Sequence, residues 1–301
     1  MSLMKRLFWW FGVNLLVIIL IECILWAIVH LLGVDLSTYD AQGNIAYQGL
    51  AIVSLVWGMA GSIISLFLSK MTVKALYRVQ VVTSSGPYRE LVQMVERLAQ
   101  RAGIEKMPEV GVYESDDPNA FATGPSKNSS LVAVSTALLR QMNHDELEAV
   151  LAHEISHVVN GDMVTMTLLQ GVMNAFVIFF SRIVAQLVAR DRNGRTSEGL
   201  YILTVIICNI AFSLLANLAV CGFSRRREYY ADAGSARLVG ADNMIQALQV
   251  LNRSAALLPP ADARVAALQI SSRPHRWIQL YSTHPSIEDR IDALRRHTYS
   301  N

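Results

Sequence analysis

The sequence predicts an α-helical membrane protein that also carries a mixed α+β domain outside the bilayer. Hydrophobic residues make up 52% of the 301 residues and charged residues only 17%, whereas a soluble domain has about a quarter charged residues. The apolar residues gather in four runs, each long enough to provide the roughly 20 residues that cross a bilayer. The other segments are more polar and show the spacing of helices and strands, which predicts the folded domain.

The four predicted transmembrane helices cover approximately residues 7–32, 46–68, 163–189 and 200–223. They divide the chain into an N-terminal membrane hairpin, a first half of the folded domain, a second hairpin and a second half of the domain, at residues 1–70, 71–162, 163–223 and 224–301. Charged side chains are costly in lipid. We therefore expect Glu22 and Arg182, which lie inside two of the runs, to face a neighbouring helix or water.

Lysine and arginine residues near the ends of the runs predict the orientation, because they are enriched on the cytoplasmic side. Basic residues precede the first run and follow the second and fourth runs, at Lys5, Arg6, Lys70, Lys74, Arg78 and Arg225–Arg227. The loop between the first two runs contains none. We therefore expect both termini and the folded domain in the cytoplasm. The link between the third and fourth runs carries three arginines, so this hairpin either spans against the charge preference, which we favour, or enters the membrane only in part.

Periodicity and capping residues predict the elements of the folded domain. In chain order we expect a helix at 87–102, strands at 110–113 and 131–135, a helix from Asn143 to Gly161, and helices at 225–239 and 242–251. The helix after Asn143 has the strongest signals, because Asn143 and Glu146 can form a capping box and Gly161 ends the pattern. Residues 116–124 are predicted to be part turn and part extended chain, and residues 258–275 a loop-rich insertion.

The candidate site centres on the segment His153-Glu154-Ile155-Ser156-His157 of that helix. Histidines four residues apart lie on one face of a helix, so both imidazoles can bind one metal ion. Glu154 is then placed to contact a metal-bound water and take its proton. Neutral imidazole suits zinc, and a catalytic zinc site has three protein ligands and one water. The alternative is an amphipathic helix with two surface histidines, against which the apolar surroundings of the segment argue.

A third ligand must come from elsewhere, and the segment Glu228-Tyr229-Tyr230-Ala231-Asp232 offers one. In the helix predicted there, Glu228 and Asp232 lie one turn apart on the same face. Glu228 would bind the metal, and Asp232 would accept the second ring N–H of a ligand histidine and fix its tautomer. The alternative is an ion pair between these carboxylates and the arginines at 225–227.

The segment HEISH followed by Asn160-Gly161-Asp162, an apolar hairpin and then EYYAD resembles the HtpX family of bacterial membrane zinc metallopeptidases, which is related to the type I CAAX prenyl proteases. The resemblance covers almost the whole chain, including the two N-terminal spans and the segment NAFATG. It implies an α-helical membrane protein with an α+β zincin-like metallopeptidase domain. It also implies one zinc ion per chain, bound by His153, His157 and Glu228, with Glu154 as the catalytic base.

The resemblance extends to two further groups of residues. In the related prenyl proteases a histidine and an arginine six residues later lie over the zinc, and His284 and Arg290 have this spacing here. His284 would donate to the developing oxyanion with Arg290 as its supporting charge; the alternative is a helix boundary with a surface arginine. The segment that resembles the extended edge with which zincins hold a peptide by strand addition comprises Asn119, Ala120, Phe121 and Ala122. Its alternative is a simple turn before a core strand.

The resemblance implies proteolytic quality control under stress, in which misfolded or damaged membrane proteins are cut on the cytoplasmic side of the bacterial inner membrane. The implied partners are protein substrates and the lipid bilayer, with functional overlap with an AAA-type membrane protease such as FtsH. Two other functions stay open: a selective processing peptidase of the prenyl-protease type, and a non-catalytic zinc-binding scaffold or chaperone. The net charge of +2 and the lack of a basic stripe with interleaved aromatic residues argue against nucleic-acid binding.

Overall fold

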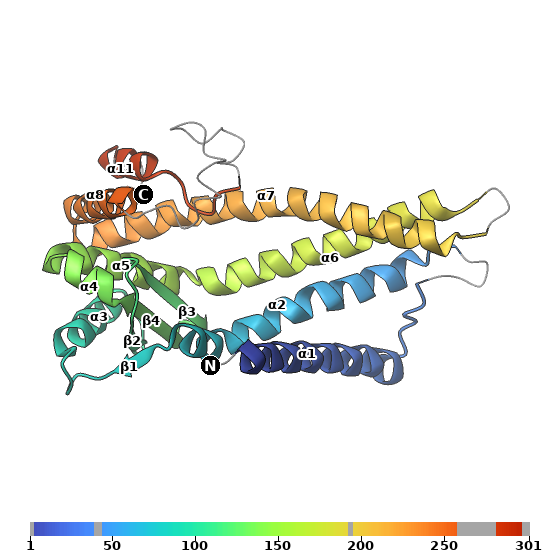
Figure 1. The fold of residues 1–301 in the computed structure, drawn as a ribbon, viewed down its shortest axis with the longest axis horizontal. Helices are drawn as coiled ribbons and strands as arrows, with labels where there is room; N and C mark the ends of the chain where they lie inside the picture. The colour runs from blue at the N-terminus through green and yellow to red at the C-terminus, as the bar shows by residue number, and fades with distance from the viewer. Residues whose placement is uncertain (1–2, 39–43, 192–194, 258–280, 297–301) are drawn as a thin grey trace. The chain divides into compact units, whose positions relative to one another are not determined.

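The computed structural model describes residues 3–38, 44–191, 195–257 and 281–296 (Figure 1). The chain divides into two compact units, of which the first contains Met1–Ser65 and Thr167–Ala219 and the second contains Leu66–Met166 and Val220–Asn301. The segment 258–275, predicted to be a loop-rich insertion, lies outside the described residues.

Long apolar helices form the first unit. They are α1 (Leu3–Leu32), the greater part of α2 (Tyr47–Tyr77), most of α6 (Asp162–Ala189) and the first half of α7 (Glu198–Val239). Among the residues searched, α2, α6 and α7 are long and apolar enough to cross a membrane, whereas α1 offers the shorter apolar helix Ile18–Leu32. Three of the four predicted spans are thereby supported, and the first span stays a prediction.

Small residues allow α2 and α6 to approach closely within this unit. A Cβ atom at Gly58 would lie 2.4 Å from the backbone nitrogen of Ala175 and 2.7 Å from the carbonyl oxygen of Gly171. Cβ atoms do not make contacts this short, so only glycine fits at position 58. Close backbone packing of this kind holds helices together in lipid, where burial of apolar surface does not drive their association.

The second unit is built around a four-stranded mixed sheet. Its strands are β1 (Gln80–Val82), β2 (Glu109–Tyr113), β3 (Ala120–Ser126) and β4 (Ser129–Ser135), in the order β1-β2-β4-β3. β2 and β4 pair in parallel, and the other two pairs are antiparallel. Within the described part of the chain β3 is therefore an edge strand, with one backbone edge that no strand pairs with.

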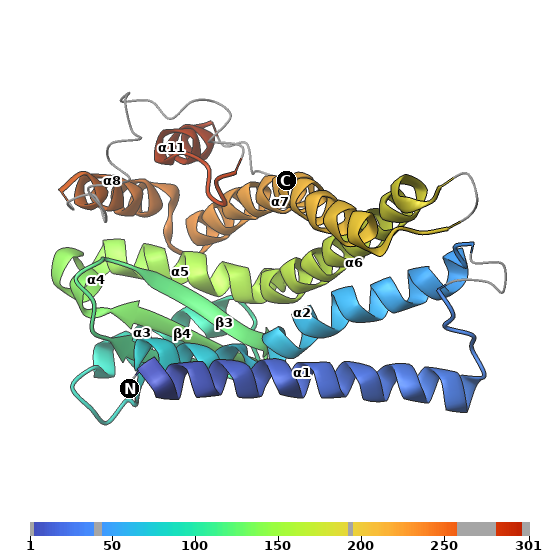
Figure 2. The same cartoon turned by 45° about the vertical axis from the view of Figure 1, so that its right-hand side comes forward.

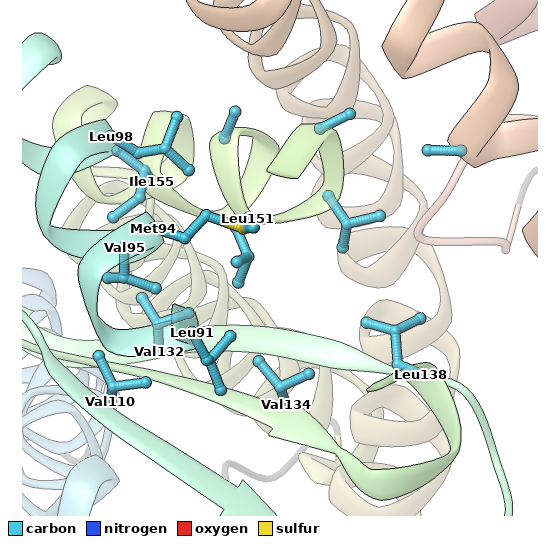
Figure 3. Close-up of a cluster of buried hydrophobic side chains, with 14 of the residues drawn as sticks. Leu91, Met94, Val95, Leu98, Val110, Val132, Val134, Leu138, Leu151 and Ile155 are labelled. Atoms are coloured by element: carbon cyan, nitrogen blue, oxygen red, sulfur yellow. The ribbon is translucent and has the colours of Figure 1, made fainter. Parts of the chain in front are cut away.

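Helices α3 (Arg89–Arg101) and α5 (His144–Asn160) contact the sheet, and α8 (Ala241–Leu257) contacts α5 in turn (Figure 2). The short helix α4 (Thr136–Gln141) follows β4 directly, and α11 (Ile287–Arg295) contacts α8. Fully buried aliphatic side chains fill the core between the sheet, α3 and α5 (Figure 3), among them Val95, Leu98, Val132, Val134, Leu151 and Ile155. Each such side chain contributes about 1.5–3 kcal/mol relative to an exposed one, so this core fixes α5 against the sheet.

The local predictions for α5 are confirmed. Asn143 Oδ1 accepts from the backbone N–H of Glu146 at 3.0 Å, the Glu146 carboxylate accepts from the N–H of Asn143 at 3.0 Å, and Gly161 has a φ of +68°. The prediction of a separate helix at 225–239 is wrong, because α7 runs unbroken from Glu198 to Val239. No proline occurs in that stretch, so nothing in the backbone ends the helix where the apolar run stops.

Candidate metal centre

Helix α5 holds two imidazole groups next to each other. His153 and His157 lie one turn apart, and their Nε2 atoms are separated by 3.1 Å. His153 is buried, and only 13% of the His157 side chain is exposed. The capping box at one end and Gly161 at the other fix the helix. The placement of the two residues one turn apart on one face of the helix therefore follows from α5 alone.

Glu228 of α7 completes a group of three donor residues. Its Oε2 atom lies 3.5 Å from Nε2 of His153, and its Oε1 atom lies 3.4 Å from Nε2 of His157. Glu228 is buried, with 2% of its surface exposed. A buried carboxylate needs hydrogen bonds or positive charge around it, and both imidazoles supply this.

The contact between α7 and α5 is close because small residues face each other. A Cβ atom at Gly234 would lie 2.3 Å from Oγ of Ser156. Ser235 donates from its hydroxyl to the carbonyl oxygen of Ala149 at 2.7 Å. The missing side chain at Gly234 therefore sets the distance between the two helices, and with it the distance from Glu228 to the imidazoles.

The three donors fit a single tetrahedral cation. A tetrahedron with bonds of about 2.0–2.1 Å, the length of zinc–nitrogen and zinc–oxygen bonds, has edges of roughly 3.3–3.4 Å. The observed separations of 3.1, 3.4 and 3.5 Å are close to this edge. A second group of donor residues in the described part of the chain, His144 with Asp145 and Glu148, is mostly exposed, and exposed acidic groups are common without a metal.

Asp232 and Arg290 form a buried pair beside His153. Asp232 Oδ1 lies 2.9 Å from Nδ1 of His153. Arg290 of α11 donates from Nε and Nη2 to the two carboxylate oxygens of Asp232, at 2.8 and 2.6 Å. The imidazole of His284 has a different environment, since its side chain is 64% exposed and Nδ1 lies 3.0 Å from Oε2 of Glu228. The structure thus pairs Arg290 with Asp232, and the support of His284 by Arg290 stays a prediction.

The carboxylates around His153 and His157 favour positive charge on or beside the two imidazoles. Burial lowers the pKa of His157, but its hydrogen bonds with Asp162 and Glu228 outweigh burial and raise this pKa to about 9. Burial also lowers the pKa of His153, yet hydrogen bonds with Asp232 and Glu228 raise it overall. Either protons or a bound cation can supply the positive charge that these carboxylates require.

A cleft with a volume of about 140 Å³ opens beside the donors. Seven of the residues predicted from the sequence line it, namely Asn119, Ala120, His153, Glu154, Glu228, His284 and Arg290. Much of the remaining wall is apolar and comes from α4, α5 and α8. Glu154 is partly exposed and does not belong to the three-donor group. Its carboxylate is therefore available for proton transfer in the cleft.

The other two residues of the predicted substrate edge do not line the cleft. Phe121 points to the opposite face of the sheet from Ala120, because successive side chains of a strand alternate. The ring of Phe121 packs against those of Tyr77 and Tyr113, with centroid separations of 5.5 and 5.6 Å. Ala122 packs against the hydrophobic core. Only the beginning of the predicted edge therefore borders the cleft.

The part of the chain that contains these residues matches a known family. The model of Peptidase family M48 matches residues 86–298. The chain belongs to peptidase family M48. The protease HtpX homolog of Bacillus licheniformis is 46% identical over 295 residues, which cover 96% of this chain and 98% of that protein. Protease HtpX of Pasteurella multocida is 47% identical over 274 residues, which cover 90% of this chain and 94% of that protein.

A solved structure shares the fold of this M48 protein. Ste24p from S. mikatae has a TM-score of 0.63 at 19% identity, and the match covers 97% of this chain and 65% of that chain. At this identity the likeness shows the fold alone. The family, the HtpX relatives and the apolar helices together identify a membrane-bound metalloprotease, whose substrates are proteins and whose family implies a metal ion.

One residue next to the donors was not predicted from the sequence. Oδ2 of Asp162 lies 2.6 Å from Nδ1 of His157. The sequence does carry a signal for it, because Asp162 directly follows Gly161, which ends the helix. A glycine in the left-handed conformation reverses the chain, so the next residue can return to the last turn of the helix.

Proposed function

We propose that this M48 protein is a zinc-dependent endopeptidase that hydrolyses misfolded or damaged membrane proteins on the cytoplasmic side of the bacterial inner membrane. The observation that carries the proposal is the group of donors from His153, His157 and Glu228, whose separations suit a tetrahedral zinc ion. The quality-control role, the stress response and the overlap with an AAA-type protease such as FtsH rest on the resemblance to the HtpX family.

His153, His157 and Glu228 would hold the zinc ion, with Asp232 holding His153 through Nδ1. A zinc ion held there would supply Lewis-acid chemistry, which would lower the pKa of a water toward about 7 and polarise the scissile carbonyl. Glu154 lines the same cleft. Its carboxylate accepts the proton of the attacking water and then delivers it to the leaving amine.

Two further groups act on the substrate or support the donors. His284 is exposed and lines the cleft beside Glu228. From this position its imidazole would donate a hydrogen bond to the oxyanion that develops on the substrate. Arg290 holds Asp232 with two hydrogen bonds, which keeps that carboxylate ionised and oriented toward His153. The start of β3 lines the cleft, and in the described part of the chain one edge of this strand pairs with no other strand. An extended substrate would be held there by strand addition.

The basic residues beside the membrane helices support a cytoplasmic location of both termini and of the active site. In this topology residues 1–70 and 163–223 are membrane hairpins, and residues 71–162 and 224–301 form the peptidase domain. Protease accessibility tests the arrangement. The peptidase domain should be cut by added protease in inverted membrane vesicles and protected in intact spheroplasts, and the opposite pattern would reverse the topology.

The decisive experiment compares the wild type with Glu154→Gln. Both proteins are purified in detergent with a chelator, given zinc, and measured for metal content and casein cleavage. We expect both to bind about one zinc per chain and only the wild type to cut, because the substitution removes the base and leaves the donors. Cleavage by Glu154→Gln at the wild-type rate would refute this mechanism. Equal zinc content without cleavage by either protein would favour a zinc-binding scaffold or a selective processing peptidase.

A further inference from the structure

Asp162 makes a contact that the mechanism above does not use. Its Oδ2 atom lies 2.6 Å from Nδ1 of His157, and the residue is 7% exposed. A nitrogen–oxygen distance this short is typical of a charge-assisted hydrogen bond. The other ring nitrogen of His157, Nε2, faces Glu228 at 3.4 Å. The two nitrogens of this imidazole therefore serve two different partners.

The turn between α5 and α6 brings Asp162 to this position. Gly161 has a φ of +68° and donates its N–H to the carbonyl oxygen of His157, so the chain reverses directly after the helix. Asp162 follows as the first residue of α6. Arg227 of α7 donates from Nη1 to the carbonyl oxygen of Asp162 at 3.1 Å, and Arg227 directly precedes Glu228. Both helices that supply donors therefore hold this turn.

We propose that Asp162 is a positioning residue of the metal centre. By accepting the Nδ1 proton of His157, it fixes the tautomer whose Nε2 lone pair is free and holds the ring toward Glu228. The inference rests on the proposed zinc site and gives each histidine its own aspartate at Nδ1, since Asp232 holds His153 in the same way. Loss of such a partner weakens metal binding about 10–100-fold.

A purely structural role must be separated from this one. An acidic residue in the first turn of a helix also stabilises the helix through its dipole, and Asp162 has this position in α6. Asp242 has the same position in α8 but is exposed and does not line the cleft. Asp242→Ala is therefore a matched control, because it removes a first-turn carboxylate that has no part in the candidate site.

The experiment measures the zinc affinity of the full chain in detergent by competition with a chromophoric chelator. We expect Asp162→Ala to weaken zinc binding about 10–100-fold. Asp162→Asn should weaken it by a smaller factor, about threefold or more, because the amide oxygen still accepts the Nδ1 proton but carries no charge. Asp242→Ala should bind zinc like the wild type. The absorption spectrum of bound Co²⁺ should change in the two Asp162 variants only, since it reports the orientation of the ligands.

An unchanged zinc affinity and Co²⁺ spectrum in either folded Asp162 variant would overturn the inference, and so would an equal loss of affinity in Asp242→Ala. If Asp162→Ala does not fold, Asp162→Asn decides, because it keeps the size and shape of the side chain. Thermal midpoints of the chelator-treated proteins separate the roles, since a structural role lowers the midpoint without changing the affinity of the folded variant. A wild type that binds no stoichiometric zinc would refute the metal site itself.

Discussion

Replacing Gly234 with alanine should separate α7 from α5 and weaken metal binding. The added Cβ atom would lie 2.6 Å from Cβ of Ser156 and 2.3 Å from its Oγ. Ordinary contact begins at about 3.4 Å, so one helix must move by roughly 0.8 Å. Rotation of the Ser156 hydroxyl does not relieve the clash, because Cβ itself is too close and because Oγ donates to the buried carbonyl oxygen of Ala152 at 2.7 Å.

Two opposing effects set the change in the free energy of unfolding. Inserting a methyl group into a tightly packed site costs about 1–3 kcal/mol, whereas alanine is favoured over glycine inside a helix by about 1 kcal/mol. The net change should therefore lie between zero and a loss of about 2 kcal/mol. Glu228 lies on the same helix, and its separations of 3.4 and 3.5 Å from the two imidazoles would grow. We expect the zinc affinity to fall about tenfold, which corresponds to about 1.4 kcal/mol.

Chelator competition and thermal midpoints of chelator-treated protein measure the two quantities. Gly222→Ala is the matched control on α7, because a Cβ atom there meets nothing closer than Nη2 of Arg225 at 3.8 Å. It should raise the midpoint and leave the zinc affinity unchanged. The double variant of Gly234→Ala with Ser156→Gly should recover most of the affinity. Wild-type affinity in Gly234→Ala, with a midpoint equal to that of Gly222→Ala, would refute the close contact between α5 and α7.

Three further predictions concern a donor, a helix cap and an ion pair. Glu228→Ala should lose most of the bound zinc and the casein cleavage together, and retention of one zinc per chain in metal analysis would contradict its role as a donor. Ser135→Ala should lower the free energy of unfolding by about 1–2 kcal/mol, because Oγ accepts from the N–H groups of Leu138 at 3.1 Å and Asn119 at 2.9 Å; an unchanged thermal midpoint would argue against this cap. Lys70 and Lys74 of α2 hold the pKa of the Glu109 carboxyl below its usual value of 4.5. The stability that these ion pairs contribute is therefore present above pH 4.5 and is lost as the pH falls through the lowered pKa of Glu109 in the folded protein. Because the side chain of Glu109 is 39% exposed, solvent screening limits this effect to less than about 1 kcal/mol, and the stability–pH curve of Glu109→Gln should be flatter than that of the wild type in this range.

Local chemistry made helix α5 predictable. The capping box at Asn143, the four-residue spacing of the histidines and the stop at Gly161 all act within one or two turns of a helix. Three elements that were not predicted, β1, α4 and α11, have only three, six and nine residues, which is too short for a period to be recognised. Helix α7 was predicted as two elements because the polarity changes at Arg225. A change of polarity does not end a helix, since only lost hydrogen bonds or backbone strain do so.

The sequence by itself determined which residues could donate to a metal, because two histidines one turn apart and the Glu228–Asp232 pair each share a helix face. Only the tertiary structure decided what surrounds them. Asp232 and Arg290 are 58 positions apart, yet they form a buried bidentate pair. Phe121 lies inside the predicted substrate edge, yet its ring belongs to an aromatic cluster away from the cleft. Helical and strand periods fix the direction in which a side chain leaves its own element, whereas the packing of the elements around the core decides which distant side chain it meets.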